Sequence, residues 1–233
     1  MQEETIILIP TLNERPNLEK LIPAIFEFMP GISVLIVDDN SQDGTENFVK
    51  ELQSKHQNLF LLERKNEFGY GKACIDGFRW ALEKDYKYIV TMDADFSHDF
   101  QTIPKLLGEL QNADAVMGSR YIKGGSVENW HWYRRLLSKF ANLYVRSILG
   151  LKVKDITTGF NAYKKEALLK SDFNRVKSEG YAFLVEFKYR LAKAGAKITE
   201  YPITFYERRE GQSKMSTKII WESIRLPWKL RKT

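Results

Sequence analysis

The feature that most constrains this chain is the alternation of short apolar runs with helical segments in its first half. β-Branched apolar runs cover 4–10, 32–39, 58–64, 86–93 and 114–120, and apolar residues at helical spacing lie between them at 17–29, 43–56, 72–84 and 103–111. These two periods predict strands and helices, respectively. Because strands that alternate with helices form mostly parallel sheets covered by helices, we expect an α/β fold.

The second half of the sequence follows a different rhythm. After Arg120 we expect longer helices, a loop at 155–160, a helix near 181–194, a strand within 196–205 and a basic tail. No repeat, low-complexity tract or linker interrupts this order. We therefore predict one domain over residues 1–215 and a basic amphipathic tail over residues 216–233.

Composition narrows the class of protein. A chain of 233 residues that is 43% hydrophobic can bury one sizeable core. No window approaches the roughly 18 apolar residues of a membrane span, and the start MQEE is acidic where a signal peptide is basic, so we expect a cytoplasmic protein. The lone Cys74 excludes an internal disulfide. The 36 basic against 30 acidic residues fit an anionic partner: nucleic acid, a phosphorylated metabolite or a membrane surface.

Polar residues follow several of the expected strands. They are Asn13 and Glu14, Asp38 and Asp39, Asp93 and Asp95, and Arg120. Ligands of open α/β sheets bind at the carboxyl ends of the strands. These residues are therefore the first candidates for a functional site.

The stretch TMDADFSH, residues 91–98, places two carboxylates after an apolar run. Side chains alternate between faces in extended chain, so Asp93, Asp95 and Ser97 would point the same way. Unpaired buried charge is costly, whereas hard oxygen ligands suit Mg²⁺ or Mn²⁺. We expect a metal site here that assists the departure of a diphosphate. The alternative for this stretch alone is a solvated turn.

Motifs along the chain form a recognisable set. They are PTLNE (10–14), VDDNSQDGT (37–45), DADFSH (93–98), GSRY (118–121), DITTGFNAY (155–163), GYAFLVE (180–186) and FYERREGQSKM (205–215). In this order they resemble the inverting GT-A glycosyltransferases of family 2, and among those the dolichol-phosphate and polyprenol-phosphate mannose synthases. The resemblance covers nearly the whole chain. It implies a Rossmann-like GT-A fold, with a mostly parallel sheet flanked by helices and with C-terminal amphipathic interface helices.

The resemblance assigns the N-terminal motifs to a nucleotide-sugar donor. It makes Pro10, Glu14 and Asp38 contacts to the nucleoside. Leu12 stands where many relatives carry an aromatic residue, which leaves stacking on the base and the preference for guanine open. The implied donor-binding set is Pro10, Leu12, Glu14, Asp38, Asp39, Asp93 and Ala94.

The same resemblance sharpens the metal prediction. Asp93 would lie near the ribose and the metal, Asp95 would ligate the metal directly, and Ser97 falls at the position of a third protein ligand. The implied cofactor is Mg²⁺ or Mn²⁺.

The acceptor side rests on basic residues. Arg120 and Arg134 resemble arginines that flank an acceptor phosphate, with Ser138 one helical turn beyond Arg134. Arg208 and Lys214 resemble cations that close over the donor diphosphate and the acceptor. The implied catalytic set is Asp95, Arg120, Arg134, Arg208 and Lys214. A monophosphate with a second pKa near 6 is mostly dianionic at neutral pH, so it needs positioning cations rather than a general base.

Two basic amphipathic stretches point to a membrane surface. In residues 131–149 one helical face carries Trp132, Leu136, Phe140, Leu143, Tyr144 and Ile148, and another carries Arg135, Lys139, Asn142 and Arg146. Residues 217–233 repeat the combination, with Trp228 next to Pro227, where we expect a break. Such helices commonly lie in the bilayer interface. For the first stretch, packing on the core or on a partner chain is an equal alternative.

These inferences predict a peripheral membrane enzyme on the cytoplasmic face. It would transfer a hexose, with mannose from GDP-mannose as the first candidate, to a polyprenyl (dolichyl) monophosphate with inversion. A separate membrane subunit is a further candidate partner. The alternatives are a UDP-glucose-dependent enzyme with the same acceptor, a family 2 transferase for a soluble or cell-wall acceptor, and a non-catalytic nucleotide-sugar-binding protein. Carboxylates at three strand ends argue against nucleic acid.

Overall fold

A seven-stranded sheet forms the centre of the molecule. The computed structural model describes residues 1–66, 68–207 and 217–232. Within them the strand order is β3-β2-β1-β4-β7-β5-β8. The strands are β1 Thr5–Thr11, β2 Ser33–Asp38, β3 Leu59–Glu63, β4 Tyr88–Thr91, β5 Ala115–Ser119, β7 Asn161–Lys164 and β8 Ile198–Pro202. Strand β7 pairs antiparallel with both neighbours and the other pairs are parallel, which confirms the mostly parallel α/β sheet.

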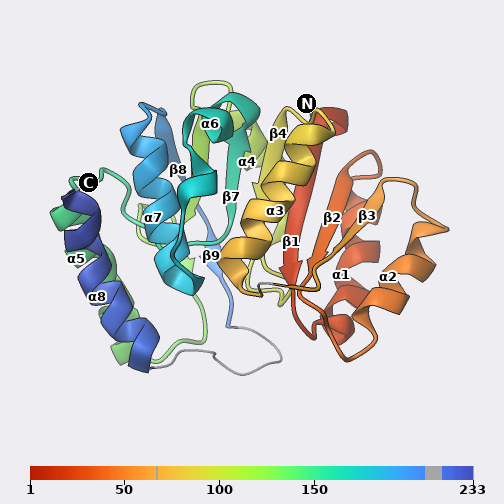
Figure 1. Cartoon of the computed structure of the whole chain (residues 1–233), viewed down its shortest axis with the longest axis horizontal. Helices are drawn as coiled ribbons and strands as arrows, with labels where there is room; N and C mark the ends of the chain where they lie inside the picture. The colour runs from red at the N-terminus through yellow and green to blue at the C-terminus, as the bar shows by residue number, and fades with distance from the viewer. Residues whose placement is uncertain (67, 208–216, 233) are drawn as a thin grey trace.

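Helices cover both faces of the sheet (Figure 1). One face carries α1 Arg15–Phe28, α2 Thr45–Gln53 and α4 Ile103–Glu109, and the other carries α3 Tyr70–Glu83, α6 Lys165–Lys170 and α7 Gly180–Lys193. Alternation along β1 supplies both cores, because Ile7 and Ile9 face the first layer while Ile6 and Leu8 face the second. The described residues also form short 3₁₀ helices, which are η1 Gln2–Glu4, η2 Phe100–Thr102 and η3 Phe173–Arg175.

The local sequence explains how the first crossover helix forms. Helix α1 has Pro16 in its first turn, where the missing N–H would have no partner inside the helix. Its buried side chains Leu18, Leu21, Ile22 and Ile25 recur at helical spacing, so one face packs on the sheet. This packing places the loop before the helix at the carboxyl end of β1, whereas the loop after the helix leads into the start of β2 at the opposite edge of the sheet.

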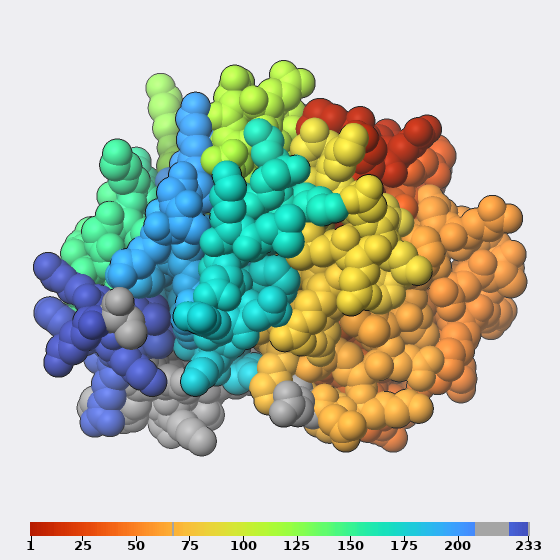
Figure 2. All heavy atoms as spheres, turned by 45° about the horizontal axis from the view of Figure 1, so that its top comes forward, coloured from red at the N-terminus to blue at the C-terminus, as the bar shows by residue number. Residues whose placement is uncertain are grey.

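Helices α5 Trp132–Leu149 and α8 Thr217–Arg231 pack together at one end of the molecule (Figures 1 and 2). Helix α8 also contacts α7, and its Leu226 and Leu230 are buried. The expected break at Pro227 is wrong, because the helix continues through this residue. A proline removes one hydrogen bond of the helix, whereas the packing of Leu226 and Leu230 holds the turns around it. The predicted domain boundary at 215/216 lies outside the described residues.

Two other details differ from the sequence expectations. Strand β7 was not expected, and it inserts between β4 and β5. The stretch 196–205 forms two strands rather than one: β8 ends at Pro202, and β9 Thr204–Phe205 pairs with β6 Ser126–Val127 in a second, two-stranded sheet. The Ile203 amide still donates to the Ser119 carbonyl at 3.0 Å, so the chain changes sheets without leaving the end of β5.

Candidate active site

The carboxyl ends of β1, β2 and β4 meet at one edge of the sheet. Thr11 pairs with Asp38 in the β1–β2 ladder, and Leu8 pairs with Thr91 in the β1–β4 ladder. Beyond the ladders, the Asp39 amide donates to the Thr11 carbonyl at 2.9 Å. The polar residues that follow these strands are thus brought together, as the sequence predicts.

Asp38 is almost fully buried and its carboxylate is held by the loop that follows it. The Ser41 amide donates to Oδ2 at 2.9 Å, and the Ser41 hydroxyl donates to Oδ1. Asn13, which has a left-handed backbone with φ of 58°, joins this loop because its Oδ1 accepts from the Gln42 amide at 2.8 Å. Asparagine tolerates this conformation better than most residues. The loops after β1 and β2 therefore form one hydrogen-bonded rim.

The neighbouring Asp39 has different partners. Its buried carboxylate pairs with the guanidinium of Arg64 and accepts from the Gly69 amide at 2.7 Å. Arg64 is held in turn by Asp76 of α3 at 2.8 Å. Asp39 thus fixes the start of α3 to the end of β2, and a direct contact between Asp39 and a donor stays a prediction.

The remaining donor-side predictions lie along the same rim. Pro10 is in β1, Leu12 is exposed just beyond it, and the Glu14 carboxylate accepts from the Asn17 side chain at 2.7 Å. Ala94 is buried after β4. These residues lie in or just after strands β1 and β4, at the same edge of the sheet as Asp38, and their roles toward a donor stay predictions.

The segment after β4 bends, so the expected extended alternation from Asp93 to Ser97 is wrong. Strand β4 ends at Thr91, and Phe96 has a left-handed backbone with φ of 59°. The turn closes on itself, because the Ser97 amide donates to Oδ1 of Asp95 at 3.1 Å and the Asp93 amide donates to Nδ1 of His98 at 3.1 Å. A turn, rather than a pleated strand, therefore presents the two carboxylates.

All three predicted metal ligands, Asp93, Asp95 and Ser97, lie in this turn. The Ser97 hydroxyl oxygen is buried and has no hydrogen-bond partner in the described part of the chain, which is unusual for a buried polar group. Within those residues no group of three or more His, Cys, Asp and Glu side chains is arranged to hold a metal. The predicted ligand set contains two carboxylates, those of Asp93 and Asp95, and its third ligand would be the Ser97 hydroxyl. Its hard oxygens fit Mg²⁺ or Mn²⁺.

His98 supports the turn from inside. It is buried and stacks on Phe160, with ring centroids 5.0 Å apart. Burial lowers the pKa of His98 to about 4. The imidazole is therefore neutral at physiological pH, and because Nδ1 accepts from Asp93, the proton is on Nε2. These contacts hold the carboxylate turn against Phe160.

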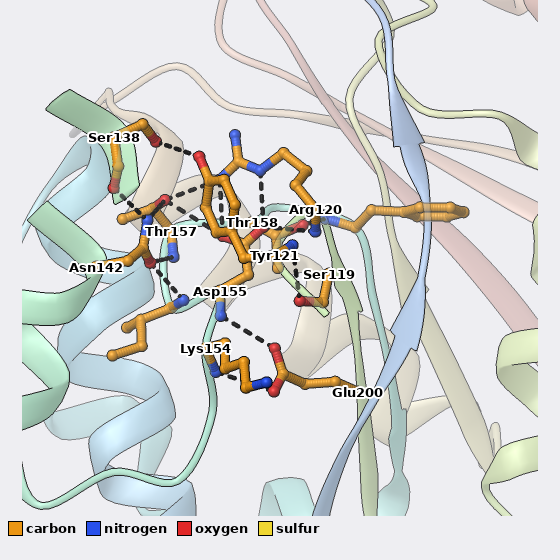
Figure 3. Close-up of polar contacts among 12 residues, drawn as sticks. Ser119, Arg120, Tyr121, Ser138, Asn142, Lys154, Asp155, Thr157, Thr158 and Glu200 are labelled. Carbon is orange, nitrogen blue, oxygen red and sulfur yellow. Dashed lines mark hydrogen bonds and ion pairs between the residues drawn. The ribbon is translucent and has the colours of Figure 1, made fainter. Parts of the chain in front are cut away.

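Arg120, directly after β5, is held by Asp155 (Figure 3). Its Nε and Nη2 each donate to the Asp155 carboxylate at 2.7 Å, and its amide donates at 3.0 Å. Nη2 also donates to the Thr157 hydroxyl at 2.9 Å. Burial alone would lower the pKa of Arg120, but the Asp155 carboxylate raises it above its ordinary value. Arg120 is thus a permanently charged group in a fixed position.

Aromatic rings connect Arg120 to Arg134. The Arg120 guanidinium carbon lies 5.2 Å from the ring centre of Tyr121 and 5.7 Å from that of Trp130. The Arg134 guanidinium carbon lies 4.1 Å from the same Trp130 ring. The Tyr121 hydroxyl donates to the Ser138 hydroxyl at 2.6 Å. The structure therefore brings Arg120, Arg134 and Ser138 together, as the sequence predicts.

Besides Arg120, the cations predicted for the acceptor side are Arg134, Arg208 and Lys214. Arg134 is part-exposed and pairs with Glu207 at 2.9 Å. Arg208 and Lys214, predicted to close over the donor, lie outside the described residues.

Sequence reasoning missed several residues that hold the cluster. Asp155 and Thr157 lie within the motif DITTGFNAY, in which no site residue was predicted. Asn142 was predicted only to share the basic face of its helix; it is buried, and its side-chain oxygen accepts from the Ile156 amide at 2.7 Å (Figure 3). Lys188 is fully buried in α7. The motif DITTGF could have identified the first two, whereas neither Asn142 nor Lys188 had a signal in the sequence.

One side of α5 is apolar and open to solvent. The exposed side chains are Trp132, Tyr133, Leu136, Leu137, Phe140 and Leu143. They include most of the predicted apolar face, whereas Ile148 is buried. Trp228 and Ile224 of α8 are also exposed, and the Trp228 indole donates to the Tyr144 hydroxyl at 2.9 Å. In the described part of the chain, no helix has both the length and the apolar character needed to cross a bilayer.

Comparison with known proteins identifies similar chains. The model of Glycosyl transferase family 2 matches residues 6–171. Polyprenol monophosphomannose synthase of Mycolicibacterium smegmatis is 41% identical over 224 residues, which cover 95% of this chain and 84% of that protein. Undecaprenyl-phosphate mannosyltransferase of Micrococcus luteus is 40% identical over 219 residues, which cover 94% of this chain and 90% of that protein.

A solved structure has the same fold. Glucosyl-3-phosphoglycerate synthase of Mycobacterium tuberculosis, in complex with Mn²⁺, uridine diphosphate and phosphoglyceric acid, superposes with a TM-score of 0.70 at 17% identity. The match covers 97% of this chain and 78% of the other. At this identity the likeness shows the fold.

Proposed function

The chain belongs to glycosyl transferase family 2, and from this premise we propose that it transfers mannose from GDP-mannose to a polyprenyl monophosphate with inversion, at a membrane surface. It is a glycosyltransferase, as its family and its relatives show. By their names, one relative is a polyprenol monophosphomannose synthase and the other is an undecaprenyl-phosphate mannosyltransferase. Their identity to this chain supports the same class of acceptor here.

One observation carries the proposal: the cluster of Arg120, Arg134 and Ser138 around Tyr121 and Trp130. Guanidinium groups match phosphate geometry with paired N–H donors, which Arg134 can offer, and a hydroxyl adds a further donor. The Nε and Nη2 of Arg120 already bond to Asp155 and Thr157, so Arg120 would reach a phosphate through Nη1. Because Asp155 fixes Arg120, binding of the dianionic acceptor phosphate would need little reorganisation of this side chain. Part-exposed Arg134 exchanges Glu207 for the acceptor phosphate.

The proposed chemistry is a single displacement. An acceptor phosphate oxygen attacks the anomeric carbon of the donor sugar from the face opposite the leaving GDP, and the bond from that carbon to the GDP oxygen breaks. Because the acceptor is already mostly dianionic, no base has to remove a proton. The basic cluster holds the phosphate in line with the anomeric carbon, and the rim around Asp38 holds the nucleoside.

A divalent cation belongs to the same proposal. Asp93, Asp95 and Ser97 would hold Mg²⁺ or Mn²⁺, which supplies stabilisation of the negative charge that develops on the departing diphosphate. The orphaned Ser97 hydroxyl supports this set, because it provides a ready oxygen ligand. The Asp95 carboxylate accepts a hydrogen bond from the Ser97 amide. This bond keeps the Asp95 carboxylate and the Ser97 hydroxyl in one turn.

The exposed face of α5 supports contact with a membrane. Trp132, Leu136 and Phe140 are each more than half exposed on a helix that also carries Arg135 and Lys139. Helices of this kind lie in the interface of anionic bilayers. Arg134 and Ser138 are on the same helix, so a bound bilayer would present a lipid phosphate directly to the cluster.

Two experiments test the proposal. The wild-type protein is assayed with GDP-mannose, UDP-glucose and UDP-galactose against a short polyprenyl phosphate and Mg²⁺ or Mn²⁺. We expect turnover of GDP-mannose, and preferred turnover of UDP-glucose would replace the donor assignment. For membrane contact, the Leu136→Glu/Phe140→Glu variant should lose co-sedimentation with anionic vesicles that the exposed control Leu169→Glu retains. Equal co-sedimentation of both variants would show that α5 does not make the membrane contact.

A further inference from the structure

Lys188 carries a fully buried amino group that the proposed chemistry does not use. It lies on α7, and its side chain is 0% exposed. Its Nζ donates to the carbonyl oxygens of Ile156 at 2.8 Å and Thr158 at 2.7 Å. Burying an amino group is costly unless hydrogen bonds replace those that it made to water, so these two bonds stabilise Lys188 in its position. Both bonds go to the loop of residues 155–160.

This loop reaches the acceptor side of the candidate site at its first residue. Asp155 holds the guanidinium of Arg120 through two bonds of 2.7 Å. Thr157 accepts a further bond from Arg120 at 2.9 Å. The position of the acceptor arginine therefore depends on where the start of the loop lies (Figure 3).

The same loop reaches the donor side at Gly159. Its carbonyl oxygen accepts from the Thr91 hydroxyl, at the end of β4, at 2.7 Å. A Cβ atom added to Gly159 would lie 2.8 Å from the Tyr70 hydroxyl and 3.4 Å from Oδ1 of Asp93. The backbone of the loop thus passes close beside the turn that carries the predicted metal ligands. Five residues span the distance from the acceptor arginine to this turn.

Two clamps hold the middle of the span from different helices. Asn142 of α5 accepts from the amides of Ile156 and Thr157 at 2.7 and 3.3 Å. Lys188 of α7 donates to the carbonyls, as described above. Asp155 and Arg120 lie close enough to act on the charge of Lys188, as does Glu200 of β8. Helix α5 therefore holds the N–H groups of the loop, and helix α7 holds its carbonyl groups.

We propose that Lys188 is a positioning residue for transfer: by holding the carbonyls of Ile156 and Thr158, it sets the distance between Arg120 and the carboxylate turn at Asp93. The inference rests on the proposed function, because it takes Arg120 as an acceptor residue. Transfer requires the acceptor oxygen and the anomeric carbon to meet within a fraction of an ångström. The rim around Asp38 is held by contacts of the loops after β1 and β2, so loss of the Lys188 contacts should weaken nucleoside binding less than transfer.

The test compares Lys188→Met, which keeps the length and removes the donors, with Lys188→Gln, whose amide can reach one carbonyl. Lys193→Met is the matched control, since Lys193 is exposed in the last turn of the same helix. For each protein we would measure kcat for transfer to polyprenyl phosphate, donor Kd by calorimetry, and hydrogen exchange of the amides in 155–160.

We expect Lys188→Met to lower kcat by about 10- to 100-fold while donor Kd changes by less than about twofold. Exchange in 155–160 should accelerate by about tenfold or more, Lys188→Gln should be intermediate, and Lys193→Met should match the wild type. If Lys188→Met does not fold, Lys188→Gln carries the same comparison.

Three results would overturn the inference: unchanged exchange in 155–160, unchanged kcat despite a loosened loop, or a donor Kd that weakens as much as transfer. Failure of the proposed function is a separate outcome. A wild-type protein that does not use polyprenyl phosphate would refute that function. The exchange measurement would still decide whether Lys188 clamps the loop, and kcat would then be compared on the acceptor that the wild type does use.

Discussion

The carboxylate of Asp155 accepts two hydrogen bonds from the guanidinium of Arg120, each 2.7 Å long, and a third from the Arg120 amide at 3.0 Å. Both side chains are buried. An arginine that ends a strand at a ligand-binding edge is thereby fixed before any ligand arrives. Preorganisation of this kind is what a positively charged phosphate site needs.

Asp155→Asn should be strongly destabilising. It leaves the buried Arg120 charge without its partner, and breaking a buried pair in this way typically costs about 3–5 kcal/mol. Chemical denaturation measures the change. The control is Asp172→Asn, which alters an exposed pair with Arg175 at a left-handed position that asparagine tolerates, and which should stay within about 0.5 kcal/mol. Similar losses in both variants would refute a special role of Asp155 in stability.

Arg134→Ala should impair transfer without affecting the donor. Losing a charge-assisted contact costs about 1.5–3 kcal/mol, so transfer to polyprenyl phosphate should fall by roughly ten- to a hundredfold or more. Arg134→Lys should recover part of it, because lysine restores the charge but not the fork of donors. Nucleotide affinity and transfer kinetics, measured on the same preparations, separate the two effects. A donor affinity that falls in step with transfer would contradict the assignment of Arg134 to the acceptor.

Ser97→Ala should act in opposite directions on stability and on metal affinity. Without metal, the hydroxyl is a buried group with no partner among the described residues, so its removal should leave the protein as stable or stabilise it by about 1 kcal/mol. Binding of Mn²⁺, followed by calorimetry with the nucleotide present, should weaken. Asp95→Ala should abolish that binding. Metal affinity that is unaffected by Ser97→Ala would remove this hydroxyl from the ligand set.

Lys188 should make stability depend on pH. Burial lowers the pKa of Lys188 to about 7 from the ordinary 10.5. Between these values the unfolded chain holds a proton that the folded chain lacks, so the free energy of unfolding rises with pH. Relative to Lys188→Met, the wild type should gain about 2 kcal/mol between pH 7.5 and 9.5. Denaturation curves of both proteins at the two pH values give the difference, and a difference that is independent of pH would show that Lys188 titrates normally.

Much of the fold could be predicted from local patterns in the sequence. The first four crossover helices and the five strands that flank them have clear apolar periods, and the structure contains all of them. Strand β7 has no such period, because Asn161–Lys164 is only four residues long and begins and ends with polar residues. Strand β7 pairs with β4 and β5, which are distant from it in the sequence, and no local pattern predicts such a pairing.

The candidate site divides in the same way. Residues in motifs at strand ends, such as Asp38, Asp93 and Arg120, could be identified before their partners were known. The residues that hold them could not, since Lys188 bonds to carbonyls 30 and 32 residues away and carries no motif. The role of Asn142 could not be predicted, because a helical period distinguishes apolar from polar side chains but does not distinguish solvated polar residues from those that bond to a loop.

The central claim is that the acceptor group is a phosphate, and one matched pair of acceptors tests it most directly. The wild-type protein is assayed with GDP-mannose and either a short-chain polyprenyl monophosphate or the corresponding free polyprenol, under identical detergent and metal conditions. The basic cluster predicts mannosyl transfer to the monophosphate, with at least a thousandfold lower rate for the alcohol, which has neither the charge nor the ionised oxygen. Comparable transfer to both acceptors, or transfer to the alcohol alone, would contradict the account.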